Sequence, residues 1–145
     1  MSLFSAIAIS ASGMDAQRTR AELITENLAN ADTTRTPEGG PYRRKDAVFT
    51  SAPAEQSFAQ ALSDFSGYPA QGVSVSQVVV DDSEPERRYL PGHPDADPDG
   101  YVAFPKINPA EEMVDLMSAS RGYQANVAAI STAKDMIARS MDLLK

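Results

Sequence analysis

The feature that most constrains this chain is a seven-residue recurrence of apolar positions near its C-terminal end. Two series of positions share this spacing: Leu116, Tyr123, Ile130, Ile137 and Leu144; and Met113, Ser120, Val127, Lys134 and Met141. Paired series of this kind are typical of the a and d positions of a helical seam. Ser120 and Lys134 weaken the seam without breaking its period. The recurrence therefore predicts a long helix over residues 109–144 with one face that needs a partner.

The start of this helix is marked by Asn108 and Pro109. An asparagine side chain accepts a hydrogen bond from the free N–H groups of the first turn, and proline at the first helical position loses no helical hydrogen bond. At 1.5 Å per residue the helix would be about 54 Å long. A seam of that length cannot be buried without another helix of similar length.

A second helix is expected at the N-terminal end, over residues 3–30. Apolar side chains recur there at steps of three and four, mainly at Leu3, Ile7, Met14, Ile24 and Leu28. Gly13 lies inside this stretch, where glycine costs about 1 kcal/mol against alanine, so a local kink is expected. This helix would be about 40 Å long and supplies the missing partner. The two terminal helices are expected to pack as an antiparallel coiled-coil pair.

The middle of the chain has a different character. Nine of the ten prolines lie between Pro37 and Pro105, whereas both ends of the chain are almost free of proline. Alternating β-branched residues predict a strand over residues 72–80, and shorter strands are expected at 47–49, 87–90 and 101–104. A short helix is expected over 54–65, and residues 91–100 contain the glycine and proline spacing of turns.

The fold class that follows is mainly α with a small β insert. The terminal helical domain comprises residues 1–31 and 108–145, and residues 32–107 form a β- and loop-rich middle segment. That segment is expected to be a short hairpin or meander with long loops, because two strands alone are marginally stable in water.

Charge and cysteine content exclude several classes of function. The formal net charge is −7, and no basic run is longer than Arg43-Arg44-Lys45. Nucleic-acid binding and binding to anionic lipid both need clustered lysine and arginine, so neither is expected. The chain has no cysteine, which excludes disulfides, thiolate zinc sites and a cysteine nucleophile. The uncharged first 14 residues lack the basic start of a secretory signal and are too short to span a bilayer, so no direct membrane insertion is expected.

One local pattern suggests a cation site. Asp95, Asp97, Asp99 and Gly100 have the spacing of the first half of a calcium-binding EF-hand loop. The twelfth position of such a loop needs a glutamate but is Lys106 here, and no helix is expected before it. A structural turn is the favoured interpretation, and a calcium-binding module is the alternative.

Catalytic chemistry has little support. His93 is the only histidine, and a lone general base still needs a nucleophile and an oriented partner. Glu111 and Glu112 fall in the first turn of a helix, where the helix dipole favours negative charge. No cofactor is expected. Arg43-Arg44-Lys45 is most simply a salt-bridged flank of a strand, and a contact to an acidic neighbouring subunit is the functional alternative. Asn27, Tyr123 and Asn126 are polar groups inside helices, where they could set register between packed helices.

Four ordered motifs carry a resemblance to a known family. They are ENLANADTTRT at 26–36 with its continuation PEGGPYRRK, PGHPDAD at 91–97 followed by GYV at 100–102, NPAEEMV at 108–114, and SRGYQANV at 120–127. Together these motifs resemble the flagellar axial proteins of the bacterial rod and hook, and most of all the proximal-rod members. The motif residues carried over are Asn27, Asn30, Thr33, Pro37, His93, Asp95, Arg121 and Asn126. Residues 51–71 do not follow the family pattern.

The resemblance implies a structural subunit of the proximal rod, which transmits torque and conducts exported subunits. It also implies export by the flagellar type III apparatus without a cleaved signal peptide, followed by assembly in the periplasm. The implied partners are copies of the chain itself, other rod proteins, the rod-to-ring adaptor and the membrane ring. A cytoplasmic coiled-coil secretion adaptor is the alternative from another class.

Overall fold

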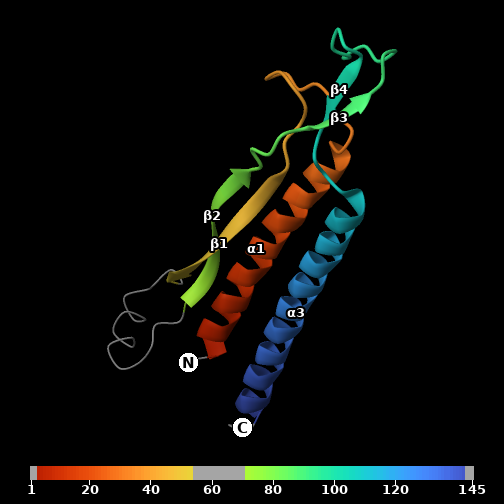
Figure 1. Cartoon of the computed structure of the whole chain (residues 1–145). Coiled ribbons are helices and arrows are strands. Elements are labelled where there is room, and N and C mark those ends of the chain that lie inside the picture. Colours follow the sequence, from red (N-terminus) through yellow and green to blue (C-terminus); the bar gives the residue numbers. More distant parts are fainter. Residues whose placement is uncertain (1–2, 54–70, 143–145) are drawn as a thin grey trace.

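The computed structural model describes residues 3–53 and 71–142 and shows an elongated molecule (Figure 1). Two helices run along most of its length, α1 (Leu3–Ala29) and α3 (Pro109–Asp142). Four strands lie between them in sequence: β1 (Lys45–Pro53), β2 (Gln71–Val80), β3 (Glu86–Tyr89) and β4 (Tyr101–Phe104). The predicted fold class, mainly α with a small β insert, is confirmed for these residues.

Helix α1 ends at a turn that Asn30 holds in place. The Asn30 backbone N–H and its side-chain Nδ2 both donate to the Glu26 carbonyl, at 3.1 and 2.9 Å. The Thr33 hydroxyl donates to Asn30 Oδ1 at 3.1 Å. These bonds use a carbonyl that the end of the helix would leave free, as asparagine often does at the C-terminal end of a helix. The helix is uninterrupted at Gly13, where the sequence predicts a kink.

Helix α3 begins where the sequence predicts. Asn108 Oδ1 accepts from the Ala110 N–H at 3.1 Å, and the Asn108 carbonyl accepts from the Glu112 N–H at 3.1 Å. Pro109 is the first helical residue, where no N–H is required. The predicted seam residue Leu144 lies outside the described residues.

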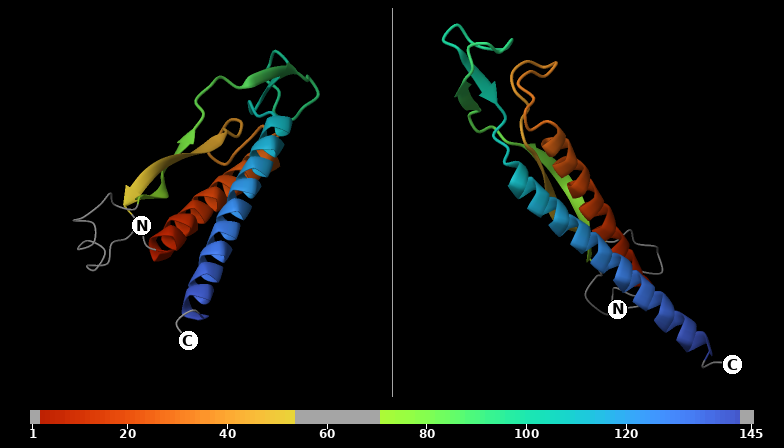
Figure 2. Two further views of the ribbon diagram at one scale, coloured as in Figure 1. Left: turned by 90° about the horizontal axis from the view of Figure 1, so that it is seen from below. Right: turned by 90° about the vertical axis from the view of Figure 1, so that its right-hand side faces the viewer.

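Helix α1 is the middle layer of the molecule. Strands β1 and β2 form an antiparallel pair from Lys45↔Val80 to Pro53↔Gln71, with an irregularity between Val48 and Phe49. This pair lies along one side of α1, while α3 lies along the other side in the opposite direction (Figures 1 and 2). Among the described elements α3 packs against α1 alone, so most of its surface is open.

All four strands lie at or close to their predicted positions, and β1 is longer than predicted. β1 covers the predicted 47–49 and continues on both sides, because its whole length pairs with β2. β2 and β4 match the predicted strands closely, and β3 begins one residue before its prediction. The helix predicted over 54–65 lies outside the described residues.

Strands β3 and β4 form a second antiparallel pair at the end of the molecule where α1 ends and α3 begins (Figure 1). Val102 is 1 % exposed there, and the rings of Tyr89 and Tyr101 meet edge to face at 5.4 Å. Gly100 has a φ of +82°, and a Cβ on it would lie 2.8 Å from the Tyr89 ring. Both its backbone angle and its lack of space therefore require glycine.

The apolar core of the described residues is thin. The buried apolar side chains are Ala16, Ile24, Tyr42, Val102, Ala119 and Ala133. Many larger ones stay open, among them Val78, Val79 and Val80 on β2 and Met113, Met117 and Met141 on α3. Since burial of large apolar groups provides most folding free energy, much of that stabilisation is not realised among the described residues.

Candidate assembly surfaces and the polar junction behind them

A buried asparagine joins both helices to the first strand. Asn27 is 0 % exposed, and its amide nitrogen donates to the Lys45 carbonyl at 2.8 Å and to Glu112 Oε2 at 3.2 Å. Its oxygen accepts from the Tyr42 hydroxyl at 3.0 Å and from the Lys45 N–H at 2.9 Å. A side-chain amide has two donors and room for two acceptor bonds, so Asn27 is fully satisfied.

Glu112 is the acidic centre of this polar junction. It is 2 % exposed, and its Oε1 accepts from Arg44 Nε at 2.6 Å. Arg44 also donates to Asp46 at 3.1 Å, and Lys45 forms an ion pair with Glu26. A buried carboxylate is stable only when it is paired and hydrogen-bonded, and both conditions hold here. We call Glu26, Asn27, Tyr42, Arg44, Lys45 and Glu112 the polar junction.

Burial and charge shift the ionisation of two groups in the junction. Burial of Tyr42, together with the negative charges of Glu26 and Glu112, raises its pKa from 10.0 to about 12. For Arg44 burial alone would lower the pKa, but the hydrogen bonds and charges of Glu112 and Asp46 together outweigh it and raise the pKa. Both groups thus keep their protons throughout the neutral range.

The shifted pKa of Tyr42 predicts a loss of stability in base. Between pH 10 and about 12 the unfolded chain gives up the tyrosine proton that the folded chain retains. The free energy of unfolding is therefore expected to fall as pH rises through this window and to be unaffected below it. Chemical denaturation at pH 9 to 12 measures this fall. A Tyr42→Phe variant should lose this component of the pH dependence, and an unchanged slope in that variant would contradict the assignment.

The two helices meet through glycine and amide side chains in their central part. A Cβ on Gly13 would lie 3.0 Å from Asn126 Nδ2, and a Cβ on Gly122 would lie 3.2 Å from Gln17 Cδ. Toward the end of α1 and the start of α3, Arg20 Nη2 donates to Asp115 Oδ1 at 3.3 Å. Small residues at such contacts let two helix backbones approach closely, so Gly13 serves close packing here.

The stripe of α3 that faces α1 differs from the predicted seam. The most buried residues of α3 are Glu112, Ala119 and Ala133. Asn126, on the same side, contacts Gly13. Each lies one position before a member of the predicted series Met113, Ser120, Val127 and Lys134. Met113 and Val127 are 54 % and 44 % exposed, and Tyr123 is 39 % exposed. Within the chain these side chains therefore form an open flank, while Leu116, Ile130 and Ile137 are half-buried.

A groove between the helices follows this flank. It is lined by Gln17, Arg18, Ala21, Leu116, Ala119, Ser120, Tyr123 and Gln124. Gln17 Oε1 is buried at this groove without a hydrogen-bond partner in the described part of the chain. On α1, the predicted residue Ile24 is buried, Ile7, Met14 and Leu28 are half-buried, and Leu3 is 37 % exposed.

The aspartate-rich turn is held by bonds within the chain. Asp95 accepts from the Thr34 hydroxyl at 2.8 Å and from Arg35 at 3.3 Å, and its N–H donates to His93 Nδ1 at 3.1 Å. The Gly100 N–H donates to the Asp97 carbonyl at 2.8 Å, as in a tight turn. Among the described residues no three His, Asp or Glu side chains converge as metal ligands. The structural turn is the interpretation that these contacts favour.

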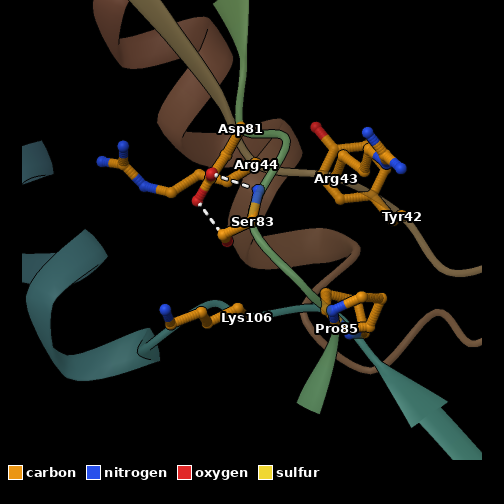
Figure 3. Close-up of a pocket in the computed structure, with 8 residues that line it drawn as sticks. Tyr42, Arg43, Arg44, Asp81, Ser83, Pro85 and Lys106 are labelled. Atoms are coloured by element: carbon orange, nitrogen blue, oxygen red, sulfur yellow. Dashed lines mark hydrogen bonds between the residues drawn. The ribbon is translucent and has the colours of Figure 1, made fainter.

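A small hollow lies beside the polar junction (Figure 3). Its lining comes from Tyr42, Arg43, Arg44, Asp81, Ser83, Pro85, Pro105 and Lys106. Asp81 accepts from the Ser83 N–H and hydroxyl at 2.9 and 3.0 Å, and these bonds lower its pKa. Arg43 pairs with Asp82. Arg43, Arg44 and Asp81 at the rim thus have partners within the chain, as the salt-bridged interpretation of Arg43-Arg44-Lys45 predicts.

The remaining motif residues have different environments. Thr33 lies in the turn after α1, where its carbonyl accepts from the Tyr42 N–H at 3.0 Å. Pro37 and Arg121 are exposed, the first in a loop and the second on α3. No helix in the described part of the chain is long and apolar enough to cross a membrane.

Sequence reasoning missed the role of Glu112. A glutamate in the first turn of a helix is explained by the helix dipole alone, so nothing local distinguishes Glu112 from the exposed Glu111. The signal lies in the joint presence of Asn27, the basic run at 43–45 and this glutamate, which only the fold brings together.

Comparison with known proteins gives matches along the whole chain. A family model described as flagella basal body rod protein matches residues 7–35, and one described as flagellar basal body rod FlgEFG protein C-terminal matches residues 99–143. The flagellar basal-body rod protein FlgC of Bacillus subtilis is 40 % identical and covers all of both chains. Those of Borreliella burgdorferi and Salmonella typhimurium are 39 % and 37 % identical, over 100 % and 99 % of this chain and 99 % and 98 % of theirs.

Proposed function

This chain belongs to the FlgC family of flagellar basal-body rod proteins, and from that premise we propose that it assembles through the open flank of its C-terminal helix. It is a structural subunit of the bacterial flagellar rod and works together with other rod components. The proposal concerns which surfaces make those contacts and where the assembly takes place.

The observation that carries the proposal is the single covered side of α3. Among the described elements only α1 packs against it, and Met113, Tyr123 and Val127 form an apolar flank beside the interhelical groove. Contiguous apolar surface of this kind marks sites of protein association. In this proposal the exposed members of the predicted seam contact a neighbouring subunit instead of α1.

The pairing of α1 with α3 supports a coiled-coil arrangement. The contacts Asn27 to Glu112 and Gly13 to Asn126 are separated by two heptads on both helices. Equal spacing on two helices that run in opposite directions is the repeat of an antiparallel coiled coil. We therefore retain a terminal helical domain of residues 1–31 and 108–145, with residues 32–107 as the middle segment that contacts other proteins.

The proposed setting is the periplasmic rod. Export by the flagellar type III apparatus without a cleaved signal peptide, contacts to the rod-to-ring adaptor and membrane ring, torque transmission and conduction of exported subunits all belong to this proposal. They rest on membership of the family together with an elongated shape and open helix faces. The proposal assigns no catalytic role to the buried carboxylate of Glu112, which is held by Arg44 and Asn27.

Thiol labelling tests the proposed surface directly, because the chain has no cysteine of its own. A Val127→Cys variant is expected to react with a maleimide in the purified subunit and to be protected in purified basal bodies. Mass spectrometry of the same preparation checks that the chain is present beside other rod proteins. Equal labelling in both states would reject this flank as the contact. Absence of the chain from basal bodies would instead favour the cytoplasmic adaptor.

A further inference from the structure

The central contact between α1 and α3 is reciprocal. Gly13 on α1 receives the side chain of Asn126 from α3, and Gly122 on α3 receives the side chain of Gln17 from α1. On each helix the glycine and the amide residue are four positions apart, so both lie on one face. Asn126 Nδ2 also donates to the Gly122 carbonyl at 3.0 Å, which fixes its side chain over Gly13. We call these four residues the amide–glycine contact.

The alanines along this stripe of α3 do not define a position along the helix. Ala119 and Ala133 are 1 % and 4 % exposed and lie seven residues to either side of Asn126. Since they are identical in shape, a shift of α3 by one heptad, about 10 Å, would present a similar small side chain to α1. A heptad repeat of small residues thus leaves register weakly specified, and a polar residue in the seam is the usual means of specifying it.

We propose that Gln17 and Asn126 are positioning residues that fix the axial register of the two terminal helices. In the observed register each amide faces a glycine. After a shift of one heptad, Gly13 faces an alanine, and Asn126 meets a position on α1 that carries a side chain. The polar junction lies where α1 ends and α3 begins, and together with the central contact it defines one register.

The register determines how far α3 extends past α1. The C-terminal end of α3 lies beyond the N-terminal end of α1 (Figure 2). A slip by one heptad would change this extension by about 10 Å, two turns of helix. In a rod built from stacked subunits, that change would displace the apolar end of α3, with Met136 and Met141, from its neighbour.

Disulfide trapping measures the register. Ala6 and Ala133 lie one heptad from Gly13 and Asn126, so they face each other in the observed register, whereas Ala6 and Ser140 face each other after a slip. Two double variants, Ala6→Cys with Ala133→Cys and Ala6→Cys with Ser140→Cys, report the two registers in the full chain. Disulfides need Cα atoms within about 7 Å, so the first pair is expected to form at least about tenfold more than the second.

The test adds Gln17→Ala and Asn126→Ala to both cysteine pairs. The proposal predicts that the ratio of the two disulfides then falls, while the intact polar junction keeps the observed register in the majority. Gln124→Ala, an exposed amide near Asn126, is the control and should leave the ratio unchanged. An unchanged ratio in the double alanine variant would overturn the proposal. So would loss of both disulfides, because the contact would then hold the helices together without choosing their register.

Discussion

Replacing Asn27 by alanine is expected to lower the free energy of unfolding by roughly 3–5 kcal/mol, the range for breaking a buried, charged hydrogen-bond network. The substitution removes four hydrogen bonds at once and leaves the Tyr42 hydroxyl, both backbone groups of Lys45 and the Glu112 carboxylate short of a partner. Water cannot readily replace them, because Asn27 is fully buried. A loss of this size is a large part of the stability of a small domain.

Urea unfolding followed by circular dichroism measures the effect, with Gln124→Ala as the matched control. That exposed amide is expected to change the free energy by no more than about 0.5 kcal/mol. Asn27→Asp adds a sharper comparison, since it keeps the acceptor oxygen but places a second carboxylate against Glu112. It should be at least as unstable as the alanine variant at neutral pH and should recover part of the loss in acid. Similar stability of Asn27→Ala and wild type would show that the junction forms no part of the cooperative unit.

The ends of the two helices could be predicted from sequence because their signals are local. Asn108 and Pro109 meet the needs of the first turn of α3 whatever surrounds them, and Asn30 does the same after α1. The strand over 72–80 could also be predicted, since alternating β-branched residues favour extended backbone in any half-buried setting. Each of these predictions depends on a few consecutive residues.

The facing side of α3 could not be predicted in the same way. The predicted seam followed the largest apolar side chains, including Met113, Tyr123 and Val127, which hydrophobic burial favours. The observed contact with α1 uses small and polar residues instead, with Ala119 and Asn126 in the central stripe. Close approach of two backbones depends on what both helices present, and a pattern on one helix does not contain that information. The large apolar side chains remain exposed, and these are the side chains that the proposed assembly contact would cover.

For a related reason, the polar junction could be recognised only once the fold was known. Arg44 and Glu112 are far apart in sequence, and each has a sufficient local explanation as a strand flank or a helix start. Asn27 could be singled out as a polar residue inside a helix, but its partners could not be named. Thr34 and Asp95 are also far apart in sequence, and their hydrogen bond favours a structural turn over a calcium loop.

Substituting Ile130 with aspartate is expected to abolish motility. Ile130 is half-buried and lies four residues after Asn126, on the side of α3 toward α1. A carboxylate at this half-buried position loses favourable hydration unless it reaches water, and the helices must separate locally to allow it. Both the pairing of the helices and the stacking of subunits would be weakened. Swimming in soft agar, in a strain that lacks its own copy, measures the outcome.

Ser131→Asp is the matched control, because it adds the same charge at the adjacent, exposed position of the same helix. It is expected to swim normally. Immunoblots of whole cells separate an assembly defect from degradation, since an unstable subunit would be lost from the cell altogether. Normal swimming by the Ile130→Asp strain would mean that this face of α3 tolerates a charge in the assembled rod. The terminal helices would then have to pair through their central glycine and amide contacts and the polar junction alone.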